Sequence, residues 1–151
     1  MNNAMKFMVL PRVYLGVIFL FAAYSKLMVP IGFPTALRGF LNTVAVPGAY
    51  AWYKPIVVGL VIPHADVFGP LIILGETLAG LGLLLGIGTR YAAIIAIFLN
   101  CNYLCAKGLP IWAPASNDVP DIILALVVIA TSAGLYYGLD GVLARNRSRR
   151  V

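Results

Sequence analysis

Residues 73–90, ILGETLAGLGLLLGIGTR, are the stretch around which the chain is organised. The stretch reads as a glycine-rich apolar helix that carries one acid, Glu76, and ends at Arg90. A charged side chain in the middle of a membrane span costs roughly 2.5 kcal/mol or more, so such residues usually face the interior of a helix bundle and have a partner there. We therefore expect Glu76 to be buried and paired.

The composition of the chain is that of a membrane protein. Of its 151 residues, 62% are hydrophobic and 11% are charged, whereas soluble domains are about half apolar and a quarter charged. Much of the formal net charge of +6 comes from a basic tail at residues 145–151, and such a tail beside a membrane span favours anionic lipid headgroups. We expect membrane lipids as partners and no nucleic acid, because no aromatic-rich basic platform accompanies the arginines.

Four apolar stretches predict membrane-spanning helices, which need about 20 residues to cross the hydrocarbon layer. Their approximate limits are 7–28, 65–87, 91–106 and 121–139. Between the first two, residues 35–46 have apolar side chains at helical spacing, and residues 50–62, broken by Pro55, are too few to cross. The predicted fold is all-α: an integral-membrane four-helix bundle in one domain, residues 1–144, with an interfacial or re-entrant segment between spans one and two.

The distribution of Lys and Arg residues orients the chain. Placing both termini in the cytoplasm puts seven of the eleven Lys and Arg residues on the inner side and four on the outer side. Because cytoplasmic loops carry an excess of positive charge, this count favours a multi-pass protein of the cytoplasmic (inner) membrane with both termini in the cytoplasm.

Four polar residues fall near the middle of the predicted spans: Tyr24, Glu76, Asn100 and Thr131. Counted from the span ends at about 1.5 Å per residue, each lies roughly 15–18 Å along its helix. We expect them to form one buried polar cluster around Glu76. The acid then either is a structural group that fixes the register of the helices, or it handles protons or faces a substrate, as intramembrane acids often do.

A second set of charged residues is expected at the outer rim, on the side opposite to the termini. Its cations are Lys26, Arg38, Lys54 and Lys107. They predict either attraction of a small anion to the outer surface or scattered side chains that extend to the headgroups. His64, the single histidine, either moves protons near neutral pH or lies exposed at the interface.

Cys101 and Cys105 are four residues apart and share one face of the third predicted span. A disulfide between them within a regular helix is geometrically poor, and further ligands for a zinc site are not found, so no metal is expected. The two residues are interpreted as buried apolar side chains or, alternatively, as redox-active thiols.

Three groups of residues carry a family resemblance. They are Arg12-x-x-x-Gly16 with Lys26, then Gly75-Glu76, Gly86, Thr89-Arg90 and Ala92-Ala93, and finally Gly138-Leu139-Asp140-Gly141. These groups resemble the first helix, the second-to-third helix signature and the closing segment of the DoxX/DoxD family of small four-helix membrane proteins. DoxD-type members are the membrane subunits of thiosulfate:quinone oxidoreductase, which oxidises thiosulfate to tetrathionate and passes electrons to quinone.

The resemblance implies a membrane subunit of a quinone-linked oxidoreductase that oxidises thiosulfate or a related reduced sulfur species. It implies quinone as the electron acceptor and a further membrane or extracytoplasmic subunit as a partner, and it leaves a homo-oligomer open. The functional positions that it implies are Arg12, Lys26, Glu76, Arg90 and Asp140.

Taken with the predicted cluster, this places the quinone ring near Glu76, with Tyr24 and Asn100 as hydrogen-bonding groups and a sulfur oxyanion drawn to the outer cations. Two other classes of function stay open. One is a non-enzymatic scaffold or assembly subunit whose glycine faces bind another membrane protein. The other is a small transporter that uses Glu76 as a proton site.

Overall fold

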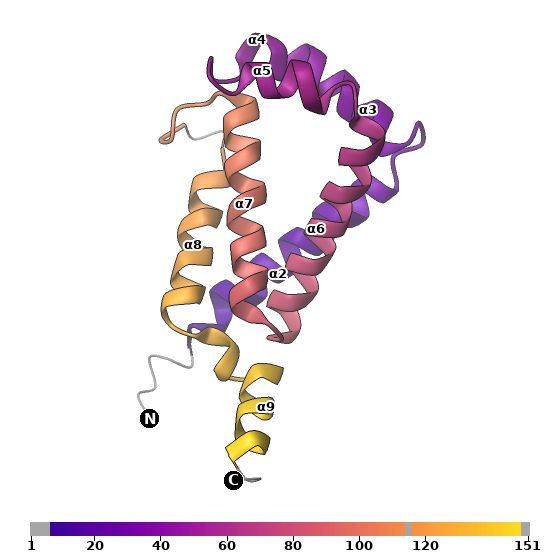
Figure 1. Cartoon of the computed structure of the whole chain (residues 1–151). Coiled ribbons are helices and arrows are strands. Elements are labelled where there is room, and N and C mark those ends of the chain that lie inside the picture. The colour runs from indigo at the N-terminus through magenta and orange to yellow at the C-terminus, as the bar shows by residue number, and fades with distance from the viewer. Residues whose placement is uncertain (1–6, 114–115, 149–151) are drawn as a thin grey trace.

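The structure is a computed structural model that describes residues 7–113 and 116–148. Within these residues all regular secondary structure is helical, which confirms the predicted all-α class. Figure 1 shows the longer helices running between the two ends of the molecule, with a group of short helices across one end. The longer helices are α2 (Val9–Leu27), α6 (Ala65–Leu85), α7 (Thr89–Lys107) and α8 (Asp118–Ala130).

The four longer helices pack in a ring. Helix α2 contacts α6, α6 contacts α7, α7 contacts α8, and α8 returns to α2. A Cβ atom on Gly16 of α2 would lie 2.7 Å from the backbone nitrogen of Leu84, and one on Gly80 of α6 would lie 2.7 Å from Cγ of Leu20. The glycines therefore bring α2 and α6 into backbone contact, as small residues do in membrane helix pairs.

The short helices between α2 and α6, residues 33–62, form a cap over one end of the molecule (Figure 1). Its buried apolar side chains, such as Leu37, Leu41 and Val57, pack in one cluster with Ala65 of α6 and Ala106 of α7. Its elements are α3 (Phe33–Phe40), the π-helical turn η1 (Leu41–Ala45), α4 (Val46–Gly48), α5 (Lys54–Ile56) and the π-helical turn η2 (Val57–Val61).

Pro55 does not break the helical run in the cap. It lies in the first turn of α5, where a proline is tolerated because its missing N–H would have no helical acceptor. The sequence expectation of an interruption at this residue is therefore corrected: the second half of the cap is helical from Lys54 to Val61.

The prediction of a continuous helix over 121–139 is wrong. Helix α8 ends at Ala130, and Ser132 adopts a left-handed backbone conformation with φ of 49°. The chain then forms a short 3-10 turn, η3 (Ala133–Leu135), and a separate helix α9 (Leu139–Ser148). At about 1.5 Å per residue, α8 is roughly 20 Å long, which is shorter than the ~30 Å hydrocarbon layer.

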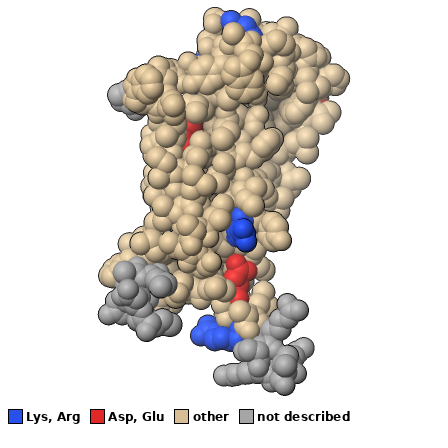
Figure 2. Space-filling view, turned by 60° about the vertical axis from the view of Figure 1, so that its left-hand side comes forward, with Lys and Arg blue, Asp and Glu red and all other residues tan. Residues whose placement is uncertain are grey.

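The described residues include two helices that are long and apolar enough to cross a membrane, α2 and α6. Helix α6 also exposes apolar side chains at spacings of three and four residues, so they form one stripe along the helix. This stripe consists of Val67, Leu71, Leu74, Leu78, Leu81 and Leu85. In Figure 2 charged atoms are few on the face shown, and uncharged residues fill most of the surface between the two ends.

Candidate functional site

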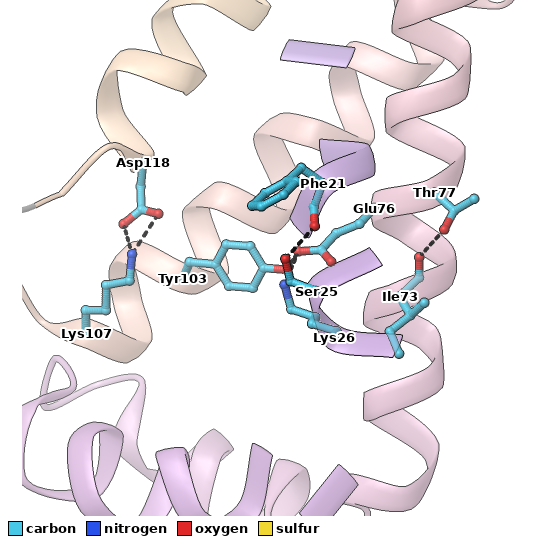
Figure 3. Close-up of polar contacts among 9 residues, drawn as sticks. All are labelled: Phe21, Ser25, Lys26, Ile73, Glu76, Thr77, Tyr103, Lys107 and Asp118. Carbon is cyan, nitrogen blue, oxygen red and sulfur yellow. Dashed lines mark hydrogen bonds and ion pairs between the residues drawn. The ribbon is translucent and has the colours of Figure 1, made fainter. Parts of the chain in front are cut away.

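Glu76 lies near the middle of the 21-residue α6 and is 1% exposed, which confirms the expectation of a buried acid. Its Oε1 atom accepts two hydrogen bonds, one from Lys26 Nζ at 2.6 Å and one from the Tyr103 hydroxyl at 2.7 Å. Its Oε2 atom has no hydrogen-bond partner among the described residues. Figure 3 shows Lys26, from the end of α2, and Tyr103, from α7, both pointing toward this carboxylate.

Lys26 reaches the middle of α6 because the helices are staggered. It is the last residue but one of α2, yet its partner lies halfway along α6. The chain leaves α2 at this level and turns at Gly32, whose φ of 78° places it in the left-handed region that favours glycine. Helix α3 then packs against the remaining part of α6, where Pro34 lies in contact with Gly69.

The Lys26 ammonium group also lies close to two aromatic rings. It is 5.6 Å from the ring centroid of Phe33 and 5.8 Å from that of Tyr103. A cation at this distance from an aromatic face is attracted by the ring quadrupole, more strongly where water is excluded. The positive charge is thus held by one carboxylate and two rings, with 22% of the side chain exposed.

A cavity of about 650 Å³ lies between the cap, the end of α2 and the half of α7 nearer the cap. Lys26 and Tyr103 line it, whereas Glu76 lies behind them and does not. Its other polar lining residues are Ser25, Tyr53, Asn102 and Lys107, and the rest of the wall is apolar or aromatic. This is the size and lining that small-molecule sites have: largely apolar, with a few polar groups that fix orientation.

The residues that contact Glu76 are not the ones predicted from the sequence. Tyr24 is 58% exposed, Thr131 donates to the carbonyl of Val127 in its own helix, and Asn100 is buried with its Nδ2 unpartnered among the described residues. None of the three contributes a hydrogen bond to Glu76 in the described structure, and Asn100 does not line the cavity. Sequence reasoning missed Tyr103, although it lies three residues after Asn100 and so on a neighbouring part of the same helical face.

The cations expected at the outer rim are mostly paired. Lys107 Nζ lies 2.9 Å from Asp118 Oδ2, Arg38 forms an ion pair with Asp66, and Lys26 is paired with Glu76. Ser116 also donates to Asp118, at 2.7 Å. The remaining cation, Lys54, donates to the Pro47 carbonyl at 3.4 Å. The outer cations therefore do not form one open positive patch for an anion.

His64 and the two cysteines lie apart from the cavity. His64 is exposed just before α6, with Nδ1 at 2.9 Å from the Leu60 carbonyl. Cys101 is exposed and Cys105 is partly buried, and both are free thiols. In the described part of the chain no three His, Cys, Asp or Glu side chains gather closely enough to hold a metal ion.

A second buried polar cluster lies at the opposite end, where α2 begins and α9 lies (Figure 1). Arg12 is 2% exposed and donates from Nη2 to the Tyr137 carbonyl at 3.2 Å. Asp140 accepts hydrogen bonds from the backbone N–H groups of Gly88 and Thr89, at 2.8 and 3.0 Å. Arg90, which the family resemblance also singled out, is exposed one residue further along α7.

The pKa of Asp140 is lowered by its surroundings. Burial alone would raise it, but the N–H groups of Thr89 and Gly88 and the positive charge of Arg12 outweigh that effect. The carboxylate thereby satisfies N–H groups at the start of α7 that have no partner within the helix. This cluster is a junction between helices rather than a wall of the cavity.

The apolar helices of spanning length and the stripe of exposed leucines define an all-helical membrane protein, with a buried ion pair beside a cavity. A family model described as DoxX matches residues 7–104, which is more than half of the chain. The protein therefore belongs to the DoxX family. The match ends before the segment at residues 138–141 that also resembles the family. No curated protein and no solved structure matches the chain.

Proposed function

We propose that this chain is the membrane subunit of a quinone-linked oxidoreductase, and that the cavity beside Lys26 and Tyr103 binds the quinone ring. The observation that carries the proposal is the Lys26–Glu76 pair, whose buried acid lies behind a lysine on the wall of a largely apolar cavity of about 650 Å³. Buried ionisable groups inside membrane proteins commonly mark substrate or proton pathways. Family membership and the resemblance to DoxD-type subunits agree with this assignment.

The cavity suits a quinone ring on two grounds. Most of its wall is aromatic and aliphatic, and Lys26 and Tyr103 are among the few polar residues on it. The Lys26 ammonium group has three N–H donors, and its hydrogen bond to Glu76 uses one of them. A ring carbonyl can accept from the others, in place of the Tyr24 and Asn100 contacts that the sequence alone suggested.

The residues around the cavity then have separate tasks. A quinone takes up electrons and protons in equal number when it is reduced, and oxidation of thiosulfate or a related sulfur species supplies the electrons. Lys26 holds a proton at Nζ beside the ring, and Glu76 stabilises that charge from behind. Tyr103 fixes the carboxylate through its hydroxyl, and the apolar wall excludes water, which strengthens these interactions.

The proposal places the protein in the cytoplasmic membrane with both termini inside. Crossings by α2, α6 and α7, and by α8 continued through η3, with the cap at the outer interface, would put the cavity in the outer half of the bilayer. The glycine faces that a scaffold would offer to a partner are in use within the chain, since Gly16, Gly80 and Gly82 contact α6, α2 and α7 respectively. A second subunit is still expected, to receive the sulfur compound.

The test is quinone reduction by the purified protein in lipid vesicles, with thiosulfate as donor. Glu76→Gln should lower kcat by about a hundredfold, the size of effect expected when a positioned proton donor is disturbed. Asp66→Asn is the matched control, because it removes an exposed acid whose ion pair with Arg38 lies outside the cavity lining; it should change kcat by less than about twofold.

Unchanged turnover and unchanged quinone binding in Glu76→Gln would exclude the proposed site. Absence of turnover in the wild type, together with a stoichiometric partner after purification, would favour the scaffold. Solute uptake that depends on a pH gradient and is lost in Glu76→Gln would favour the transporter.

A further inference from the structure

The cavity has a mixed lining. Lys26 and Tyr103 are polar lining residues that contact Glu76, whereas most of the remaining lining is apolar. Four of the large apolar lining residues are exposed: Phe40 and Ile56 at 41% each, Leu60 at 48% and Phe98 at 64%. We call these four residues the mouth. Because lining residues that are also exposed mark where a cavity reaches the surface, the cavity opens at the mouth.

The mouth lies between the cap, which carries Phe40, Ile56 and Leu60, and the side of α7, which carries Phe98. Phe98 is the middle residue of α7, whose limits are Thr89 and Lys107. At about 1.5 Å per residue it therefore lies roughly 13 Å from either end of the helix. The exposed apolar stripe of α6 includes Leu74 and Leu78, which flank Glu76 at the middle of that helix. Lipid acyl chains cover this height in a membrane-spanning protein.

The cavity is also larger than one ring requires. A protein cavity of about 150 Å³ is enough to bind benzene, whereas this one measures about 650 Å³. A ring held at Lys26 and Tyr103 leaves most of the cavity volume free. An aliphatic substituent on the ring fits that space and points toward the bilayer.

We propose that the mouth is a lateral portal that holds the isoprenoid tail of the quinone, so that the substrate enters from the bilayer rather than from water. The four mouth residues contact the first part of the tail, and the remainder lies among the lipid chains. The inference rests on the proposed quinone site, and it adds a tail-binding segment that the polar residues do not supply. It predicts that changes at the mouth affect tailed quinones only.

The experiment compares two ubiquinone-type probes with the same ring, one with a methyl group and one with a ten-carbon tail, binding to the whole protein in nanodiscs. Leu60→Trp narrows the mouth. Val58→Trp is the matched control, because Val58 lies in the same π-helical turn and is 49% exposed but does not line the cavity. For each variant the Kd of the tailed probe is divided by that of the methyl probe, and this ratio is compared with the ratio for the wild type. Partitioning of the tail into lipid is the same for all variants, so it cancels.

Leu60→Trp should raise Kd for the tailed probe about tenfold, which corresponds to losing roughly two buried methylene groups. The methyl probe should bind as in the wild type, and Val58→Trp should bind both probes normally. A diazirine placed near the ring end of the tail should label peptides that contain a mouth residue. Equal weakening of both probes, or equal effects of the two Trp variants, would overturn the portal.

Failure of the quinone site gives a different result. If the wild type binds neither probe but a diazirine-bearing phospholipid chain labels the mouth and Leu60→Trp abolishes that labelling, the lateral opening stands and the quinone assignment is wrong. If no probe labels the mouth, the portal is excluded.

Discussion

The protein holds charged groups in two clusters, but it packs them in opposite ways. On the side of the molecule nearer the cap, which we call the outer side, the Lys26–Glu76 pair lies beside a cavity of about 650 Å³. At the opposite end, which we call the inner end, Arg12 and Asp140 are surrounded by glycines: a Cβ atom on Gly86 would lie 1.6 Å from Arg12 Nη1, and one on Gly134 would lie 2.5 Å from Asp140 Oδ2. Even one added carbon atom would clash at these two glycines of the inner cluster, whereas the outer cluster adjoins a cavity.

The two clusters use their charged groups differently, one to join helices and the other beside a cavity. The Asp140 carboxylate accepts hydrogen bonds from N–H groups at the start of α7, and the Asp140 backbone N–H donates to the Gly86 carbonyl at 2.8 Å. These bonds join α9 to the turn between α6 and α7, so the inner cluster is a structural junction. Both clusters contain buried polar atoms without a hydrogen-bond partner among the described residues, Arg12 Nε and Nη1 in the inner one and Glu76 Oε2 in the outer one. The outer cluster differs because its Lys26 lies on the wall of the cavity, where it can meet a ligand.

The largest effect should come from breaking the outer pair. Lys26→Met leaves Glu76 buried without its cation, and an uncompensated buried charge typically costs about 3–5 kcal/mol of unfolding free energy. Adding Glu76→Leu removes the orphaned acid and should recover most of that loss. Thermal and denaturant unfolding in detergent would measure both variants. If the unfolding free energy of Lys26→Met lies within about 1 kcal/mol of the wild-type value, the pair is not a buried ion pair.

A somewhat smaller effect is expected at the inner junction. Gly86→Ala places a methyl group against the Arg12 guanidinium and strains a backbone with φ of 67°, so it should lower the unfolding free energy by about 2–3 kcal/mol. Quinone binding by the fraction that remains folded should be unchanged, since Gly86 does not line the cavity. Altered quinone affinity in that fraction would show that the two clusters are coupled.

Asp140 should make the inner junction sensitive to acid. Because its folded pKa lies below the usual value, its contribution to stability is complete above the unfolded pKa of about 3.9 and is lost as pH falls through the folded pKa. Asp140→Asn should cost about 1–2 kcal/mol at neutral pH and remove this acid dependence. The check is to measure the unfolding midpoints of the wild type and of Asp140→Asn at pH values from 7 downward. If both midpoints fall with pH in parallel, the acid dependence does not come from Asp140.

The smallest expected effect is an increase in the free energy of unfolding. Gly39 lies in α3 with nothing within 4 Å of an added Cβ atom, so Gly39→Ala should raise the unfolding free energy by about 0.5–1 kcal/mol through helix propensity alone. The difference between the stability changes of Gly39→Ala and Gly86→Ala measures the cost of crowding and backbone strain at Gly86. A loss of stability in Gly39→Ala would mean that the cap needs flexibility at this position.

The helices and the buried acid could be predicted from the sequence, but the partners of the acid could not. Counting inward from helix ends assumes that the helices begin level with one another, whereas α2 ends halfway along α6. Tyr24 and Lys26 are two residues apart, and so about 200° apart around the helix. Once Lys26 faces Glu76, Tyr24 must face outward, as its 58% exposure shows.

The end of the fourth predicted span was missed for a similar reason. Residues 131–139 are apolar enough to continue a helix, yet the chain turns at Ser132 so that Gly134 and Gly138 can pack on Thr89 and Arg12. Tertiary contacts of this kind override a local apolar pattern, because burial of Arg12 requires its hydrogen-bond acceptor to come from a distant segment.

By itself the sequence determined the all-α class, the apolar helices, the family and the presence of an acid at the middle of the second long helix, because these follow from composition, periodicity and motif. Only the tertiary structure decided which lysine pairs with Glu76, that Tyr103 completes the cluster, and that a cavity with a lateral mouth lies beside it. Those features depend on how far each helix is shifted and rotated against its neighbours, which is set by side-chain packing between distant segments.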